Sequence, residues 1–179
     1  MPICFVTGNE NKFNEVKSIL NLNLERENIN LEEIQEIEPE RIVKHKARQA
    51  FLILRKPVLI EDTGLFIEAW NGFPGALTKW LLKAVGNEGV CKMLENEKNR
   101  NAKAKTYFCL YNGKKYNIFS GEMEGTIPMK PKGKNNFGWD PIFIPDNQNK
   151  TFAQMESEEK NKISMRKIAL EKLKNFLKR

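Results

Sequence analysis

Two adjacent carboxylates, Glu61 and Asp62, directly follow the apolar run Val58-Leu59-Ile60. Such a run predicts a buried strand, and α/β sheets bind ligands beyond the carboxyl ends of their strands. Alternation along a strand would send the two side chains to opposite faces, so we expect residues 61–64 to break the strand and turn both into one cleft. Paired carboxylates suit Mg²⁺, which takes oxygen ligands and bridges phosphates, and one could deprotonate a water. A turn with a solvated Glu61 is the alternative.

A glycine turn with a lysine lies between the first predicted strand and the first predicted helix. The strand is the apolar run at 3–6, and the turn is Thr7-Gly8-Asn9-Glu10-Asn11-Lys12. Backbone amides at a helix start favour an anion, Gly8 permits close approach, and Lys12 adds a positive charge. The spacing matches neither a P-loop nor a GxGxxG motif. An anion site and an ordinary capped turn therefore both remain open.

A basic loop precedes two aromatic residues and an acid. Lys130, Lys132 and Lys134 lead into Phe137-Gly138-Trp139-Asp140-Pro141. Aromatic faces beside an acidic side chain suit a nucleobase that is stacked and hydrogen-bonded. The alternative is a hairpin loop whose two aromatic rings belong to the core.

The single histidine and the three cysteines argue against several other chemistries. His45 lies about 200° around its helix from Val43, at about 100° per residue, so we expect it on the solvated surface. Without a second histidine, Ser-His-Asp catalysis and histidine-ligated metals have no support. Cys4, Cys91 and Cys109 are widely spaced and form no CxxC pair. This pattern argues against disulfides and thiolate-bound zinc, and it favours a reducing cytoplasm.

Composition indicates a soluble globular protein with an anionic partner. The 179 residues (20.8 kDa) suit a single domain spanning 1–179, with 40% hydrophobic and 30% charged residues. Lys and Arg total 30 against 23 Asp and Glu, and the net charge of +7 favours a nucleotide, a nucleic acid or a phosphorylated metabolite. The chain shows no apolar run long enough for a bilayer and no basic leader, so we expect neither a membrane nor secretion.

Two predicted helices must help to position these segments. Val43, Ala47 and Ala50 recur at helical spacing, and Pro39 suits a helix start, which predicts a helix over 40–54. A second helix from about residue 77 should turn three apolar side chains inward, namely Leu81, Ala84 and Val85.

The second half of the chain predicts a hairpin and a terminal helix. Extended segments at 102–111 and 116–127 flank Asn112-Gly113, a strong hairpin signal. We also expect a short strand over 141–144 and a C-terminal helix that begins near Ser157 or Ser164. One face of that helix should carry Ala169, Leu173, Phe176 and Leu177. Early helices and a late hairpin predict an α/β fold with a mixed sheet.

Together these segments resemble the inosine triphosphate pyrophosphatase family, the Ham1-like non-canonical purine nucleoside triphosphate pyrophosphatases. Five segments carry the resemblance over almost the whole chain, in the family's order and spacing: Thr7-Gly8-Asn9-Glu10-Asn11-Lys12, Val58-Leu59-Ile60-Glu61-Asp62-Thr63-Gly64-Leu65, Gly72-Phe73-Pro74-Gly75, Phe137-Gly138-Trp139-Asp140-Pro141-Ile142-Phe143 and Thr151-Phe152-Ala153-Gln154-Met155. The resemblance implies a long twisted mixed sheet flanked by helices, in two lobes with a central substrate groove. It also implies a homodimer.

The activity implied by the resemblance is hydrolysis of ITP, dITP and XTP to the monophosphate and pyrophosphate. Such an enzyme would remove deaminated purine nucleotides from the nucleotide pool. Its cofactor would be Mg²⁺, for which Mn²⁺ could substitute. The resemblance implies no stable partnership with nucleic acid and no membrane.

The resemblance also implies a role for each matching residue. Asp62 would be the general base and a Mg²⁺ ligand, with Glu61 and Glu33 as further ligands. Because the chain carries one extra residue before the helix at 40–54, Glu36 and Glu38 remain alternatives to Glu33. The phosphates would contact Thr7, Gly8, Asn9, Glu10, Asn11, Lys12, Lys46 and Lys79. The rest of the substrate would contact Thr63, Phe137, Gly138, Trp139, Asp140, Lys160, Met165 and Arg166.

Two departures from the family concern the base rather than the phosphates. The family's Ser-His-Arg before the last helix is Ser164-Met165-Arg166 here, and the glycine usually found before Phe137 is Asn136. Met165 can pack on a base but offers only a weak sulfur acceptor, so we expect weaker discrimination between bases.

Two other functions remain open from the sequence. A Maf-like pyrophosphatase would share the architecture and act on other nucleotides. A basic nucleic-acid-binding module would explain the +7 charge and the lysine-rich loop. It would have little use for Glu61 and Asp62 in a basic groove.

Overall fold

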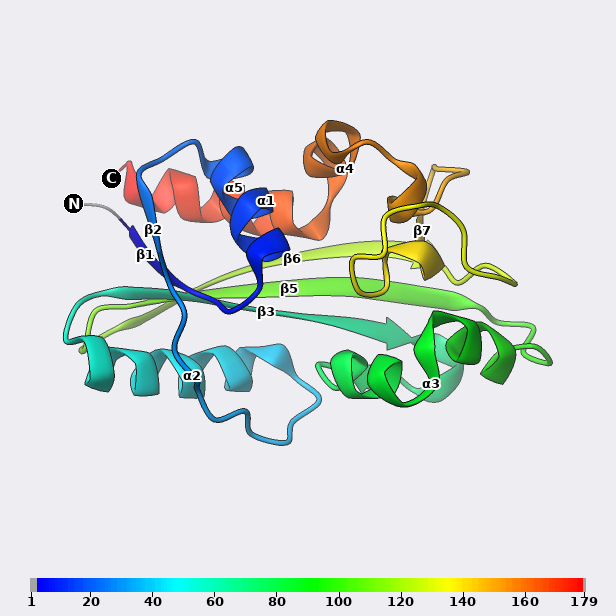
Figure 1. Ribbon diagram of the computed structural model, residues 1–179, viewed down its shortest axis with the longest axis horizontal. Helices are drawn as coiled ribbons and strands as arrows, with labels where there is room; N and C mark the ends of the chain where they lie inside the picture. The colour runs from blue at the N-terminus through cyan, green and yellow to red at the C-terminus, as the bar shows by residue number, and fades with distance from the viewer. Residues whose placement is uncertain (1–2, 179) are drawn as a thin grey trace.

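A seven-stranded mixed sheet forms the centre of the computed structural model, which describes residues 3–178 (Figure 1). The strand order is β2-β1-β3-β5-β6-β7, with β4 paired to β3 off this path. β1 runs parallel to β2 and β3, and the other pairs are antiparallel, which confirms the predicted mixed sheet. The strands are β1 Ile3–Val6, β2 Leu24–Glu27, β3 Val58–Ile67, β4 Pro74–Gly75, β5 Asn101–Tyr111, β6 Tyr116–Thr126 and β7 Ile144–Pro145.

Helices cover both faces of the sheet (Figure 1). On one face lie α1 (Glu10–Leu20), α4 (Ser157–Ile163) and α5 (Met165–Leu177). On the other lie α2 (Pro39–Leu54) and α3 (Thr78–Met93). Short 3₁₀ turns are η1 (Glu68–Trp70), η2 (Asp140–Ile142) and η3 (Phe152–Gln154). None of the helices within residues 3–178 has the length and apolar character needed to cross a membrane.

Three predicted elements are confirmed. α2 begins at Pro39. The first N–H groups of a helix have no partner within the helix, so a proline, which lacks this N–H, loses no hydrogen bond there. β5 and β6 form the expected hairpin, with Gly113 at a φ of 90° that favours glycine. Both proposed starts of the C-terminal helix are used, because Ser164 ends α4 and then caps α5 by accepting a hydrogen bond from the Lys167 backbone amide.

The predicted break after Ile60 is wrong, because β3 runs unbroken to Ile67. Its ladder with β5 extends from the pair Val58 and Tyr111 to the pair Ile67 and Ala102. Each of these positions gains a strand partner, and this pairing overrides the local preference of residues 61–64 for a turn. The two carboxylates therefore stay in a regular strand.

The segment around Pro141 also departs from its prediction. Residues 140–142 form the 3₁₀ turn η2, in which the backbone amides of Asp140 and Ile142 donate to the carbonyls of Phe137 and Trp139. Only Ile144 and Pro145 pair as a strand, β7. The short strands β2 and β4 had no sequence signal strong enough to predict them.

α3 does not follow the predicted inward face. Leu81 is half-buried, whereas Ala84 and Val85 are exposed. Gly86, with a φ of 68° and a ψ of 177°, interrupts the helix directly after these residues, and the apolar side chains buried beyond it are Val90 and Cys91. In α5, Ala169 and Leu173 are buried as expected, but Phe176 and Leu177 are each 38% exposed.

The remaining sequence predictions concern histidine and cysteine. His45 is half-buried rather than fully solvated, because Gln49 one turn later hydrogen-bonds its Nδ1 at 2.8 Å. Cys4, Cys91 and Cys109 are all buried and unpaired.

A gap in the sheet beside β3 determines where a ligand can enter. β1 pairs with β3 only at Val58 and Leu59, and β4 pairs only at Leu65 and Phe66. In the part of the chain that the structure describes, no strand covers this edge of β3 between Leu59 and Leu65. The edge that carries Glu61 and Asp62 is therefore open from both faces of the sheet.

Gly121 on β6 allows α5 to approach the sheet closely. A Cβ atom at this position would meet the Met165 carbonyl oxygen at 1.9 Å and the Ala169 backbone nitrogen at 2.8 Å. We expect Gly121→Ala to lower the free energy of unfolding by about 1–3 kcal/mol, the usual cost of overpacking. Because α5 begins with two cavity residues, ligand binding should weaken as well.

Urea unfolding measures this effect. Ser120→Ala, which changes the neighbouring residue on the same strand, is the matched control and should unfold at nearly the wild-type midpoint. Equal midpoints for Gly121→Ala and the wild type would contradict the close packing of α5 on β6.

Candidate active site

A cavity of about 1170 Å³ lies at the open edge of β3. Its walls come from the β1–α1 turn, β3, α2, α3, the loop before η2 and the start of α5. Ligand pockets commonly measure roughly 300–1,000 Å³, so this cavity can hold a large ligand. Six lysine and arginine side chains and four carboxylates line it, which favours an anion.

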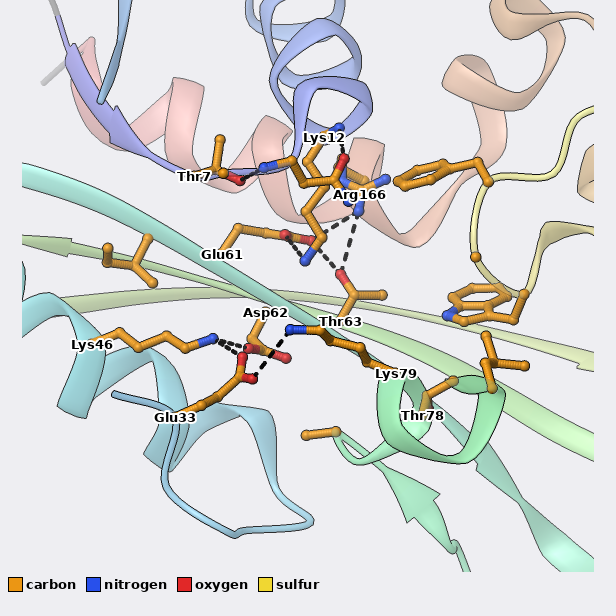
Figure 2. A pocket seen from close by; sticks show the side chains of 18 of the residues that line it. Thr7, Lys12, Glu33, Lys46, Glu61, Asp62, Thr63, Thr78, Lys79 and Arg166 are labelled. Carbon is orange, nitrogen blue, oxygen red and sulfur yellow. Dashed lines mark hydrogen bonds and ion pairs between the residues drawn. The ribbon is translucent and has the colours of Figure 1, made fainter. Parts of the chain in front are cut away.

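β3 divides the two adjacent carboxylates between its faces (Figure 2). Glu61 meets Lys12 and Arg166 on the side of α1 and α5, whereas Asp62 meets Lys46 of α2 on the other side. Both side chains still line the same cavity, because the gap in the sheet leaves the strand edge open. The predicted cleft with both carboxylates is therefore present, but a strand edge creates it rather than a turn.

Glu61 is buried and remains ionised. Arg166 Nη2 lies 2.9 Å from its Oε1, Lys12 Nζ lies 2.6 Å from its Oε2, and the Thr63 hydroxyl donates to Oε1. Burial alone would raise the pKa of Glu61, but Lys12 and Arg166 lower it to about 2. Lys12 is thus the partner of Oε2, and Arg166 and Thr63 are the partners of Oε1.

Asp62 has the opposite electrostatic environment. Burial raises the pKa of Asp62, although Lys46, with Nζ 2.9 Å from Oδ2, opposes the shift. Lys46 also bonds Glu33, and Lys79 Nζ lies 3.8 Å from the same carboxylate (Figure 2). Burial would raise the pKa of Glu33, but its hydrogen bond with Lys46 lowers it overall. A buried carboxylate with a raised pKa is a better proton acceptor than an ordinary aspartate.

The turn before α1 is built to face an anion. Asn9 caps the helix, with its side chain accepting from the Lys12 amide at 3.0 Å. Arg26 of β2 donates to the carbonyls of Thr7 and Gly8, at 3.1 and 3.0 Å, and so neutralises the acceptors of this turn. At Gly8 a Cβ would lie 2.9 Å from Asn28 Oδ1, so a larger residue here would displace the Asn28 side chain.

A buried charge network lies on the aromatic side of the cavity, next to Glu61 and Lys12. Lys160 is 3% exposed, and its Nζ lies 2.6 Å from Asp140 Oδ2 and 2.7 Å from Glu15 Oε1. Burial raises the pKa of Asp140 to about 6, although Lys160 opposes the shift. Arg166 is 1% exposed and also pairs with Glu15. The Phe137 ring lies 4.8 Å from Lys160 Nζ, within cation–π range.

Two residues at the start of α5 complete this side of the cavity. Met165 lines the cavity and is also buried in the core cluster that contains Trp139, so it both packs and contacts the ligand space. Arg166 uses Nη1 and Nη2 in ion pairs, but its buried Nε has no hydrogen-bond partner. An unpaired buried donor in a cavity wall favours a ligand with an acceptor atom.

All the predicted site residues except Glu10 and Asn11 line the cavity. Those two residues are exposed in the first turn of α1. Glu33 lines the cavity, whereas Glu36 and Glu38 do not. Glu36 instead accepts hydrogen bonds from nearby backbone amides and pairs with Arg41.

Sequence reasoning missed several residues that support the site. Glu15 holds both Lys160 and Arg166, and its spacing of three from Lys12 on a predicted helix was the available signal. Thr78 accepts a hydrogen bond from the Leu65 amide at 2.9 Å and lines the cavity. No sequence pattern indicated the contacts of Arg26 or Asn87.

The predicted metal ligands do not form a preformed cluster. Within residues 3–178, no group of three His, Cys, Asp or Glu side chains is placed to hold a metal. Glu33 and Asp62 lie on the same side of β3 and share Lys46, whereas Glu61 lies on the other side. Mg²⁺ commonly uses one or two carboxylates together with substrate phosphates, so this all-oxygen pair fits it. The Mg²⁺ site stays a prediction.

A cavity lined by a cationic turn, further lysines and two aromatic rings has the chemistry to suit a phosphorylated aromatic ligand. Residues 3–176 match the Ham1 family. The chain is 42% identical to the dITP/XTP pyrophosphatase of Methanopyrus kandleri, over 99% of this chain and 97% of that relative. It is 45% identical to the inosine triphosphate pyrophosphatase of Yarrowia lipolytica, over 99% and 96%.

Structural similarity agrees with the sequence match. A HAM1 protein from Coxiella burnetii has the same fold with a TM-score of 0.85, at 30% identity and 99% coverage of both chains. This chain belongs to the Ham1 family, which confirms the resemblance seen in its motifs.

Glu61 should make the stability of the fold sensitive to acid. The pKa of Glu61 is about 2 in the native protein, against 4.5 for a glutamate without these partners. The ionised carboxylate therefore stabilises the fold above pH 4.5, and this contribution is lost as the pH falls toward 2. From pH 7 to pH 3 the group should account for about 2 kcal/mol of lost stability. Glu61→Gln should therefore be less stable at pH 7 but lose less stability on acidification.

Urea unfolding at both pH values tests this prediction. Glu124→Gln is the control, because Glu124 is exposed and its pairing with Lys103 is screened by solvent. If Glu61→Gln and the wild type lost equal stability between pH 7 and pH 3, the lowered pKa of Glu61 would be wrong.

Proposed function

We propose that this protein hydrolyses non-canonical purine nucleoside triphosphates, namely ITP, dITP and XTP, to the monophosphate and pyrophosphate. Relatives at 42% and 45% identity carry the names dITP/XTP pyrophosphatase and inosine triphosphate pyrophosphatase. Removal of deaminated purine nucleotides from the nucleotide pool would be the biological role.

The observation that carries this proposal is the unpaired Nε–H of buried Arg166. Hypoxanthine and xanthine have a 6-oxo oxygen that accepts a hydrogen bond, whereas adenine has an amino group that only donates there. Adenine would leave the arginine donor unpaired in a buried site, which costs about 1–3 kcal/mol. Arg166 therefore supports a preference for 6-oxo purines over adenine, even though Met165 stands where the family has a histidine. Guanine shares the 6-oxo group, so the expected preference over GTP rests on the names of the relatives.

The lysines around the β1–α1 turn, α2 and α3 suit the phosphates. A triphosphate carries about four negative charges, and the α1 N-terminus with Lys12, Lys46 and Lys79 offers positive charge to offset them. A base held at Phe137 and phosphates held at the β1–α1 turn would place the ligand along the open edge of β3. Phosphoryl transfer depends mainly on such positioning and charge stabilisation, so a serine or cysteine nucleophile is not required.

Asp62 is the proposed general base. It would accept a proton from a water whose oxygen bonds to phosphorus while the anhydride bond between the α- and β-phosphates breaks and pyrophosphate leaves. Lys46 orients the Asp62 carboxylate, and burial raises its basicity. Glu33 and Asp62 would hold Mg²⁺ together with phosphate oxygens, and the ion would supply further neutralisation of the phosphate charge.

A substrate panel tests the function directly. With Mg²⁺, ITP, dITP and XTP should give pyrophosphate at a higher kcat/KM than GTP, ATP or UTP. EDTA should abolish the activity, and added Mg²⁺ or Mn²⁺ should restore it. Orthophosphate as the first product would contradict the proposed reaction.

The same panel separates the rival functions. A Maf-like pyrophosphatase would prefer other nucleotides in the panel. A nucleic-acid-binding module would release no pyrophosphate and would bind duplex or single strands with a steep salt dependence. The carboxylates on both faces of β3 disfavour a polyanionic strand in this cavity.

Asp62→Asn tests the general base without changing the size of the side chain. We expect kcat to fall at least about a hundredfold, the usual contribution of a general base. Stability should change little or increase, because burial already disfavours the charged form of Asp62. Steady-state kinetics and urea unfolding measure the two effects.

Glu38→Gln is the matched control for this variant. Glu38 is exposed, lies outside the cavity and makes no capping hydrogen bond through its side chain. Its kcat should equal that of the wild type. Wild-type turnover in Asp62→Asn would remove this residue from the proton transfer.

We also propose a homodimer and a cytoplasmic location. Three apolar side chains on α3 and directly before β4 are 40–51% exposed and offer surface that a second copy could bury, namely Phe73, Trp80 and Val85. The three unpaired, buried cysteines suit a reducing compartment.

A further inference from the structure

Asn87 links the two sides of the cavity at its aromatic end. Its side chain lies on α3, and its Nδ2 donates to the carbonyl oxygen of Gly138 at 2.9 Å. Gly138 belongs to the loop between Phe137 and Trp139, which comes from the opposite side of the cavity. Both Asn87 and Gly138 line the cavity, so this hydrogen bond forms part of its wall.

The backbone on both sides of this bond is shaped to make it. Gly86 interrupts α3 with a φ of 68°, and Gly138 has a φ of 57°. At neither glycine would a Cβ meet any atom within 4 Å. A side chain would therefore fit in the space at both positions. Glycine is favoured there because the backbone is left-handed, a conformation that other residues rarely adopt. Each glycine turns the chain beside one partner of the hydrogen bond.

The break at Gly86 divides α3 into two parts, and both pack against the core cluster that contains Trp139. The part before it carries Thr78, Lys79 and Lys83 in the cavity wall. The part after it buries Val90 and Leu94 in the cluster that contains Trp139. Asn87 lies at the junction, so its bond to Gly138 fixes the aromatic loop relative to the lysines.

A second, smaller cavity shows that packing alone does not hold the loop here. About 280 Å³ of space lies between residues 85–88 of α3 and the loop at 131–141, and Asn87 lies in its wall as well. Asn87 Oδ1 is buried and accepts no hydrogen bond. The side-chain amide therefore acts through its Nδ2, which donates to the Gly138 carbonyl. Loss of that donor would leave the Gly138 carbonyl without this partner, beside space into which the loop can shift.

We propose that Asn87 is a positioning residue for the nucleobase. This proposal rests on the function proposed above. By holding the Gly138 carbonyl, it keeps the Phe137 ring beside Lys160 and sets the width of the base pocket. It has no side-chain contact with the proposed phosphate contacts, so its effect falls on the base and not on the triphosphate.

Asn87→Leu removes the donor at nearly constant volume. The KM for ITP should rise roughly 3- to 10-fold, the equivalent of one net hydrogen bond, with kcat within about twofold of wild type. The inhibition constant of inorganic tripolyphosphate, which has no base, should not change. Asn87→Gln keeps the amide and should recover part of the loss, and Glu88→Gln on the same helix is the matched control.

Hydrogen exchange of the protein without ligand gives a readout that needs no activity. Asn87→Leu should raise the exchange rate of amides at 136–142 and leave other segments unchanged. An unchanged KM for ITP, or an equal rise in the tripolyphosphate inhibition constant, would overturn the base-positioning role. If the wild type released no pyrophosphate, the proposed function would be wrong. Hydrogen exchange would still test the restraint by itself, because unchanged exchange at 136–142 in Asn87→Leu would show that Asn87 does not hold the loop.

Discussion

The ion pairs of buried Arg166 organise the site. Arg166 joins Glu61 of β3 to Glu15 of α1, and Glu15 in turn joins Lys160 of α4, which pairs with Asp140 of η2. Elements from both ends of the chain are thus fixed around one end of the cavity. Removal of one partner from such a network leaves an uncompensated buried charge, at a cost of about 3–5 kcal/mol. The wall of the cavity is therefore tied to the stability of the fold.

β3 gives two neighbouring carboxylates different chemistry. Glu61 faces two cations and has a lowered pKa, whereas burial raises the pKa of Asp62 on the other face. Environments that separate the pKa values of paired acids are how proteins assign them to different roles. In this protein Glu61 is suited to holding Lys12 and Arg166 in place, and Asp62 is suited to accepting a proton. A turn at this point would have exposed both to one environment.

Much of the site could be predicted from sequence because its motifs are local. The β1–α1 turn, the carboxylate pair and the aromatic loop each have a contiguous signature, and nearly all of their residues line the cavity. The partners of those residues could not be predicted in the same way. Glu15 contacts residues more than 140 positions away, and Asn87 contacts a loop 51 positions away. Such contacts depend on topology, which leaves no local pattern.

The sequence by itself determined the helix at 40–54, the hairpin around Asn112-Gly113, the mixed sheet and the family. Periodicity, turn chemistry and ordered motifs are properties of neighbouring residues, so they can be read along the chain. Only the tertiary structure decided that residues 61–64 continue as strand, because the ladder with β5 supplies backbone partners that a local turn would lose. It also decided that Glu61 and Asp62 face opposite sides and still share one cavity, since that depends on where β1 ends and β4 begins beside them.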